Sequence, residues 1–182
     1  MPEYGVMSSK FIYILSLLFL ISCADDKPRQ KVEDENSNEQ KTEAITTKAI
    51  ENFKFNDYIL SDDAKNEVTN WSKFQELSTQ ISYLRTADVT FFTDAKDTLK
   101  VFLDSLRVSI PDNINTNSIN SRISVLETKL LKLNNDLKLD NYAVDNKLKS
   151  IKELLIANSN LIYMINKEIE IKKRDVGRPE GE

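Results

Sequence analysis

The chain has 182 residues and a formal net charge of −4, with three glycines, one cysteine and no histidine. This composition excludes Ser–His–Asp and Cys–His catalytic sites, the common zinc sites with His or Cys ligands, and a disulfide framework. The scarcity of glycine also excludes phosphate-cradling loops and dinucleotide fingerprints, and the acidic balance disfavours a nucleic-acid partner.

An apolar run from Phe11 to Leu20 is the first recognisable element. It is about half as long as a helix that spans a bilayer, and it matches the apolar region of a secretory signal peptide. Residues 1–9 contain Glu3 and no basic residue, whereas a start at Met7 would leave a short polar segment with Lys10 before the run. We therefore expect residues 1–22 to be a signal peptide, with Met7 as its true start.

The residues Leu20-Ile21-Ser22-Cys23 close this run with the pattern of a lipobox: an apolar residue, two small or apolar residues, and then cysteine. Cys23 is the only cysteine, so no other thiol in the chain could pair with it. We expect the mature protein to begin at Cys23 and to carry fatty acyl chains there. Because two or more acyl chains hold a protein stably on a membrane, the membrane is a predicted partner.

The three residues after the lipobox, Ala24, Asp25 and Asp26, resemble the acid-rich export signal of surface lipoproteins in Bacteroidetes-type bacteria. A solvated linker would explain these acids equally well, so surface exposure and the inner leaflet of the outer membrane both stay open. Residues 23–50 are polar and rich in Asp, Glu, Lys and Asn. Such a segment cannot bury enough apolar surface to offset its ordering entropy, and we expect a disordered linker there.

Residues 51–174 are predicted to form an all-α domain. No glycine lies between Gly5 and Gly177, so the regular turn signals of strand and hairpin proteins are missing. A helix break is expected at residues 111–117, and residues 175–182 are expected to be a disordered tail. Apolar residues recur at intervals of three and four on both sides of the break; the first stripe comprises Ala64, Val68, Trp71, Phe74, Leu77, Ile81 and Leu84.

Two architectures fit this pattern. In one, two arms of about 50 and 55 residues form an antiparallel hairpin roughly 75–80 Å long, with coiled-coil-like packing. In the other, weak points at residues 88–93 and 134–141 become turns, and the segments close into a three- or four-helix bundle. The apolar face near residues 154–165 is broader than a two-stranded seam needs. We therefore expect a further layer to cover it, or a partner that contacts a patch at Ile156, Tyr163 and Met164.

Carboxylates remain as candidate catalytic groups, in the pairs Asp62-Asp63, Asp94/Asp97 and Asp140/Asp145. They fall at predicted helix ends or solvent faces, where capping and solubility account for them. We therefore expect no enzymatic activity, no catalytic residue, no cofactor and no metal site. Several aromatic residues could serve as a ligand platform, but their place on or beside the apolar stripe favours core packing: Trp71, Phe74, Phe91, Phe92 and Phe102.

This layout resembles the small, uncharacterised lipoproteins of flavobacteria, which have a lipobox, an acidic linker and a helical region. The portions that carry the resemblance are residues 58–65, Ile110-Pro111 and residues 125–130. The resemblance implies no activity. We expect a lipid-anchored protein of the cell envelope, at the outer membrane, whose helical body acts as a non-catalytic interaction or structural module. It would bind a protein partner or a second copy through a helical face; the alternative is a small-ligand carrier or chaperone-like binding protein.

Overall fold

Six α-helices and two short 3₁₀ helices make up most of residues 44–176, the residues that the computed structural model describes, and these residues contain no strand. The all-α prediction is therefore confirmed. In chain order the elements are α2 (Thr47–Glu51), α3 (Asp62–Val68), α4 (Ser72–Arg85), η2 (Phe91–Thr93), α5 (Lys96–Val108), η3 (Asp112–Ile114), α6 (Asn117–Lys138) and α7 (Val144–Val176).

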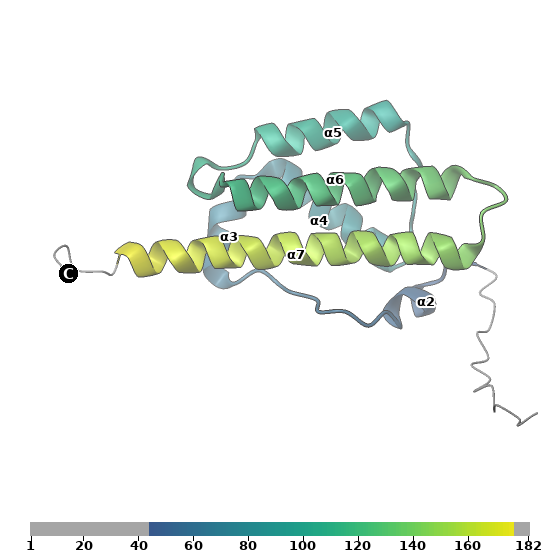
Figure 1. The fold of residues 1–182 in the computed structure, drawn as a ribbon, viewed down its shortest axis with the longest axis horizontal. Helices are drawn as coiled ribbons and strands as arrows, with labels where there is room; N and C mark the ends of the chain where they lie inside the picture. Colours follow the sequence, from purple (N-terminus) through teal and green to yellow (C-terminus); the bar gives the residue numbers. More distant parts are fainter. Residues whose placement is uncertain (1–43, 177–182) are drawn as a thin grey trace, which may run out of the picture. The chain divides into compact units, whose positions relative to one another are not determined.

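The four long helices α4, α5, α6 and α7 run alternately in opposite directions, as an up-and-down bundle (Figure 1). The turns between them lie at residues 86–95, 109–116 and 139–143. The first predicted arm is thus divided into α3, α4 and α5 and the second into α6 and α7, and the bundle is the architecture that the structure shows. The second break lies at Asp140-Asn141, as α6 continues through Asn134-Asn135.

Capping side chains set the starts of three helices. At α2, Thr46 accepts a hydrogen bond from the Ala49 N–H at 3.2 Å. Ser61 has an extended backbone and accepts a hydrogen bond from the Ala64 N–H at 3.2 Å, so α3 begins directly after it. Thr116 accepts in the same way from the Ile119 N–H at 3.3 Å and defines the start of α6. Each hydroxyl satisfies one of the N–H groups that the first turn of a helix leaves without a partner.

The end of α4 is closed by a left-handed residue. The Asp88 N–H donates to the Tyr83 carbonyl and the Ala87 N–H to the Leu84 carbonyl, both at 3.0 Å, which is the hydrogen-bond pattern of a Schellman motif. Ala87 has φ 67°, a conformation that glycine adopts without steric cost. The chain uses alanine here, and its methyl group is half-buried against the core.

The predicted apolar stripes form the core. Every residue of the first stripe is buried, including Trp71 and Phe74, whose rings stack at 5.0 Å. The Trp71 Nε1–H donates to the Leu106 carbonyl at 3.0 Å, so burial leaves no polar atom of this side chain without a partner. Phe92 and Phe102 are buried as well, which confirms that these aromatics pack in the core.

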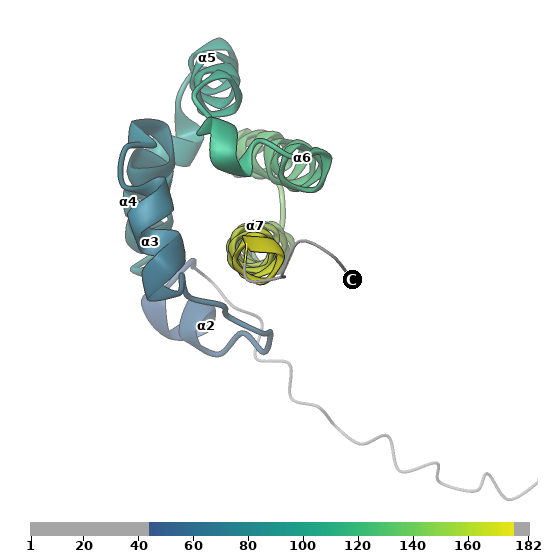
Figure 2. The same ribbon diagram turned by 90° about the vertical axis from the view of Figure 1, so that its left-hand side faces the viewer.

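Helix α7 has α6 on one side, α3 and α4 on another, and α2 with the chain that follows it on a third (Figure 2). The Tyr58 ring lies 4.8 Å from the Tyr163 ring. Ile156, Tyr163 and Met164 are accordingly half-buried and do not form the expected exposed patch. The cover that this broad apolar face requires comes from the chain itself.

The helical body begins earlier than the predicted boundary at residue 51. Ile50 in α2 is 4% exposed and belongs to the core, and Ile45 packs beside it. The linker prediction for residues 23–50 was thus wrong for its last residues, because two isolated apolar side chains in a polar stretch give no periodic signal. At the other end, α7 continues to Val176, two residues into the expected tail. Residues 23–43 and 177–182 lie outside the described residues.

The turn between α4 and α5 is tied to α6 by a buried asparagine. Asn134 is 2% exposed, and its Nδ2 donates to the carbonyls of Phe92 at 2.8 Å and Asp94 at 3.0 Å. Lys138 Nζ also donates to the Asp94 carbonyl, at 2.7 Å. Since buried carbonyls without partners are costly, these bonds stabilise the turn against the bundle.

Candidate functional site

The predicted anchor lies outside the described residues. This applies to the lipidation site Cys23, to the lipobox before it and to the export signal after it: Leu20, Ile21, Ser22, Ala24, Asp25 and Asp26. Within residues 44–176, no helix combines the length and the apolarity needed to cross a membrane. Candidate sites in the helical body therefore come from its polar side chains and surface hollows.

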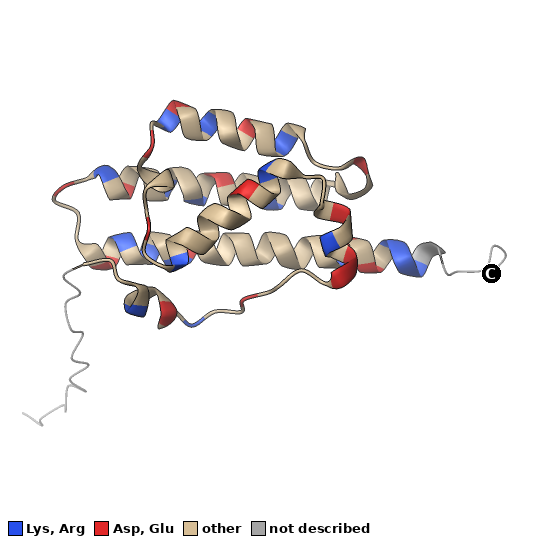
Figure 3. Ribbon diagram, turned by 180° about the vertical axis from the view of Figure 1, so that it is seen from behind, with Lys and Arg blue, Asp and Glu red and all other residues tan. Residues whose placement is uncertain are grey.

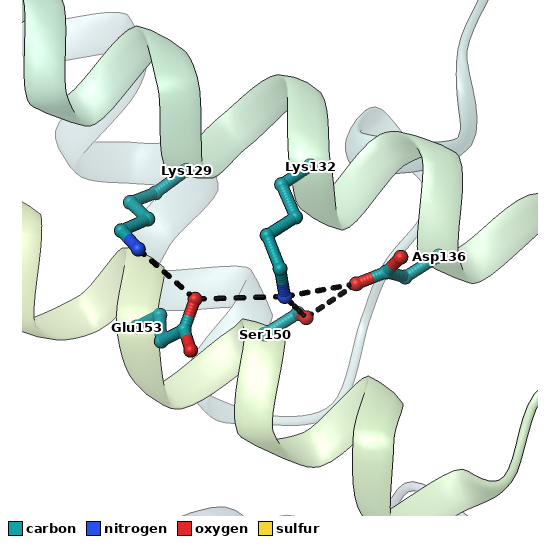
Figure 4. A network of polar contacts seen from close by, with 5 residues as sticks. All are labelled: Lys129, Lys132, Asp136, Ser150 and Glu153. Atoms are coloured by element: carbon teal, nitrogen blue, oxygen red, sulfur yellow. Dashed lines mark hydrogen bonds and ion pairs between the residues drawn. The ribbon is translucent and has the colours of Figure 1, made fainter.

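Five polar side chains form a network along the seam between α6 and α7 (Figure 4). The Lys132 Nζ atom lies 3.1 Å from Asp136 Oδ2 and 3.5 Å from Glu153 Oε2, and it donates to Ser150 Oγ. Ser150 in turn donates to Asp136, and Lys129 pairs with Glu153 at 3.1 Å. Lys132 and Asp136 are four residues apart, so they share one face of α6 opposite the α7 residues.

Burial and pairing act in opposite directions on these groups. Burial raises the pKa of Asp136, but hydrogen bonds from Ser150 and Lys132 outweigh it and hold this pKa below its ordinary value. Burial also raises the pKa of Glu153. The hydrogen bond to Lys129 and the charge of Lys132 outweigh this effect, so the pKa of Glu153 lies below its ordinary value. For Lys132, burial lowers the pKa, and Asp136 and Glu153 more than offset this, so the pKa is raised. All three groups are charged at neutral pH.

Ser150 and Lys132 are joined by a hydrogen bond, as a serine nucleophile and a lysine base would be. Two observations oppose that role. Ser150 is 1% exposed, and the pKa of Lys132 is raised, whereas a lysine that acts as a base needs a lowered pKa. The serine proton is directed to Asp136 instead. We interpret the network as a clamp that fixes the register of α6 against α7.

Other charged residues are spread along the helices and turns (Figure 3), and those that the structure describes are exposed or half-buried. Asp62 and Asp63 occupy the first turn of α3, where acidic side chains stabilise a helix. Asp62 pairs with Lys65 at 2.8 Å, and Asp63 pairs with Lys173 near the end of α7. The other candidate carboxylates are exposed: Asp94, Asp97, Asp140 and Asp145. Helix ends and solvent faces thus account for the carboxylates, as predicted.

A hollow of about 460 Å³ opens between α4, α7 and the extended residues 57–60, and we call it the α4–α7 groove. Residues 57–60 form one wall, and α4 forms the other. The remaining lining residues come from three helices: Ser78, Ile81, Ser82 and Arg85 from α4, Asn158 and Ile162 from α7, and Lys65 from α3.

The extended wall of the groove is attached to both helices. Ser159 of α7 is fully buried; its Oγ donates to the Asn56 carbonyl at 2.7 Å and accepts from the Tyr58 N–H at 2.8 Å. Arg85 at the end of α4 forms an ion pair with Asp57 at 2.9 Å, which joins the two walls. These contacts hold the extended residues 57–60 in place against α4 and α7.

A second side chain of α7 binds the same wall. Asn166 lies seven residues after Ser159, on the same face of the helix. Its Nδ2 donates to the Ile59 carbonyl at 2.8 Å, and its Oδ1 accepts from the Ser61 N–H at 2.9 Å. Short polar side chains of α7 thus hold an extended main chain through both its donors and its acceptors.

Asn158 also lines the groove, and its side-chain oxygen has no such partner. It is 4% exposed, and its Oδ1 atom accepts no hydrogen bond within the described part of the chain. A buried acceptor that lacks a donor costs about 1–3 kcal/mol. Sequence reasoning missed this residue, although the signal was an asparagine within the broad apolar face of residues 154–165.

A smaller hollow of about 350 Å³ lies where α3 and α7 meet residue 113. Four of its polar side chains form two pairs: Asn113 donates to Glu67, and Lys173 pairs with Asp63. Because these groups satisfy one another, the α4–α7 groove is the stronger candidate for a binding site.

The fold and these sites define a small all-α bundle with a polar clamp in its α6–α7 seam and a surface groove with an unpartnered amide. Comparisons of the chain with protein-family models, curated proteins and solved structures give no match.

Proposed function

We propose that this protein is a lipid-anchored protein of the bacterial cell envelope whose helical body acts as a non-catalytic binding module. The observation that carries the proposal is the lipobox Leu20-Ile21-Ser22-Cys23 directly after an apolar run of signal-peptide length. The acidic residues Asp25 and Asp26 resemble a surface export signal and favour the outer membrane.

The arrangement of the chain supports a tethered role. Residues 24–43 separate Cys23 from the helical body, and this stretch is mostly polar, with Val32 as its only large aliphatic residue. The body itself buries its apolar stripes in one core. Acylation of Cys23 would supply the attachment to the membrane, since each buried acyl methylene contributes about 0.8 kcal/mol.

A binding role without catalysis fits the chemistry of the body. The chain has no histidine. In its most nucleophile-like arrangement, Ser150 is buried and its neighbour Lys132 is charged. The α4–α7 groove offers hydrogen-bonding groups and apolar contacts, which suit recognition of a partner.

Metabolic labelling with palmitate tests the anchor. Bacteria that express the wild-type chain, Cys23→Ala or Ser22→Ala are grown with labelled palmitate, and the protein is isolated. We expect label on the wild type and on Ser22→Ala, which keeps a small residue before the cysteine, and none on Cys23→Ala. Equal labelling of Cys23→Ala would overturn the proposal. Protease treatment of intact cells then separates surface exposure, which predicts cleavage, from the inner leaflet, which predicts protection.

A further inference from the structure

We propose that residues 44–60 form a strap that detaches from α7 as a unit while α3 to α7 stay folded. Residues 57–60 are one wall of the α4–α7 groove, so the groove loses that wall when the strap opens. In the anchored protein, a pull on the linker would reach the strap before any other part of the helical body. That consequence rests on the proposed function, whereas the strap itself is defined by the helical body alone.

The strap lies along one face of α7 (Figure 1), and its contacts follow the same order in both segments. The pairs, in chain order, are Phe53 with Lys152, Asn56 and Tyr58 with Ser159, Tyr58 with Tyr163, and Ile59 with Asn166. The four α7 residues are separated by seven, four and three positions, so they share one face of the helix. A pull at the start of the strap would therefore break these contacts one after another.

The strap contributes little to the buried core. Ile50 is its only buried residue, and among the described residues every other buried apolar side chain comes from Ala64 or later. Five further apolar residues of the strap are half-buried against the core: Ile45, Ala49, Phe53, Phe55 and Leu60. The core that α3 to α7 form is thus nearly complete without the strap.

Side chains attach the strap to the bundle. The main-chain hydrogen bonds described for residues 44–60 lie within the strap itself, and its links to α7 are the bonds from Ser159 and Asn166. The ion pair of Asp57 with Arg85 is more than one-third exposed on both sides. Helix α2 has five residues, and an isolated helix shorter than about 12–15 residues is marginal in water, so the released strap would lose its structure as a whole. Segments with few buried contacts open at a lower free energy than the core.

The opening should stop at Ser61, the residue that follows the strap. Its Oγ accepts from the Ala64 N–H and caps α3, and Ala64 and Val68 of this helix are buried in the core. Ile59, just before this point, is 80% exposed, so little packing opposes a change of backbone direction there. Helix α3 can therefore stay on the bundle while the residues before it move away.

Thiol labelling of the full chain with Cys23→Ala tests the proposal, with iodoacetamide as the reagent and mass spectrometry as the readout. Ser159→Cys places a thiol under the strap, and Ser150→Cys places one in the α6–α7 seam; the two serines are 0% and 1% exposed. We expect the thiol of Ser159→Cys to react about 100-fold faster, because only the thiol of Ser150→Cys requires the bundle to open. Equal rates would overturn the proposal.

A second substitution in each labelled chain tests whether the strap controls access. Asn166→Ala removes the side-chain bonds to the end of the strap and should speed labelling of the Ser159→Cys thiol by about fivefold, the effect of roughly one net hydrogen bond. Labelling of the Ser150→Cys thiol should not change. Asn160→Ala makes the same change beside Ser159 and should alter neither rate. No acceleration by Asn166→Ala, or equal acceleration of both thiols, would contradict the strap.

Hydrogen exchange in the Cys23→Ala chain, with no other substitution, gives an independent measurement. The Tyr58 N–H donates to the buried Ser159 Oγ at 2.8 Å, and Leu130 lies in the buried face of α6. We expect the Tyr58 amide to be protected and yet to exchange about 100-fold faster than the Leu130 amide. Exchange at the Leu130 rate would show that the strap opens only with the bundle, and an unprotected Tyr58 amide would show that no strap is held. Because residue 23 is alanine in every chain, none of these outcomes bears on the anchor.

Discussion

Replacement of Asp136 by asparagine should weaken the clamp between α6 and α7. The carboxylate accepts from Ser150 and from Lys132, and its side chain is 8% exposed. Hydrogen bonds to a charged group contribute about 1.5–3 kcal/mol, roughly twice the value for neutral partners. The Lys132 side chain is 41% exposed, so solvent screening reduces its share. An amide keeps the shape and loses the charge, and we expect Asp136→Asn to lower the free energy of unfolding by about 1–2 kcal/mol at pH 7.

Urea denaturation followed by tryptophan fluorescence measures this change. Trp71 is the only tryptophan and is fully buried, so its emission reports exposure of the core on unfolding. Glu76→Gln is the matched control, because Glu76 pairs with Lys73 on the surface of α4. This change should cost less than about 0.5 kcal/mol, as surface ion pairs usually contribute little.

The pH dependence gives a second, independent readout. The pKa of Asp136 is lower in the folded state than in the unfolded chain. Its stabilising effect is therefore fully present above the unfolded value, about 3.9, and is lost as the pH falls through the folded pKa. The stability gap between wild type and Asp136→Asn should shrink as the pH is lowered from 7 to 3. Equal stability at pH 7, or a gap that does not change with pH, would refute the interpretation of the clamp.

Two further substitutions test individual features of the fold by the same urea assay. Ala87→Gly relieves the left-handed strain at φ 67° and should raise the free energy of unfolding by about 0.5 kcal/mol, because the steric gain exceeds the added entropy of the unfolded chain. A clear loss of stability would show that the packing of the alanine methyl group contributes more than the strain costs. Asn158→Leu replaces a buried acceptor that has no partner and should stabilise the unliganded protein by about 1 kcal/mol. A destabilised variant would mean that the amide is satisfied in the free protein.

The helical core could be predicted from the sequence because apolar spacing is a direct consequence of helix geometry. The stripe from Ala64 to Leu84 is buried throughout, and the break near Pro111 separates α5 from α6. The weak β-branched segment at residues 88–93 also became a turn. These features depend on local propensity and period, which a single sequence contains.

Tertiary contacts explain what the sequence could not predict. Asn134 was expected to weaken its helix, yet its side chain binds carbonyls of a turn about 40 residues earlier. Helix α2 has only five residues and depends on contacts with α4 and α7 for its order. The clamp at Lys132, Asp136 and Ser150 joins two helices through polar residues, which an apolar pattern does not register.

The two candidate sites also differ in how far the sequence alone predicts them. The anchor at Cys23 is a short linear motif, so the sequence alone predicts it. The α4–α7 groove is formed by residues 57–60, α4 and Asn158, which lie far apart in the sequence. Only the folded bundle shows that the Asn158 amide lines this groove without a partner.

The most direct test of the proposed anchor is the mass of the N-terminal peptide from protein purified out of bacterial membranes. Our account predicts a peptide that begins at Cys23 and carries the added mass of at least two fatty acyl chains. A peptide with unmodified Cys23 still joined to Ser22 would contradict it.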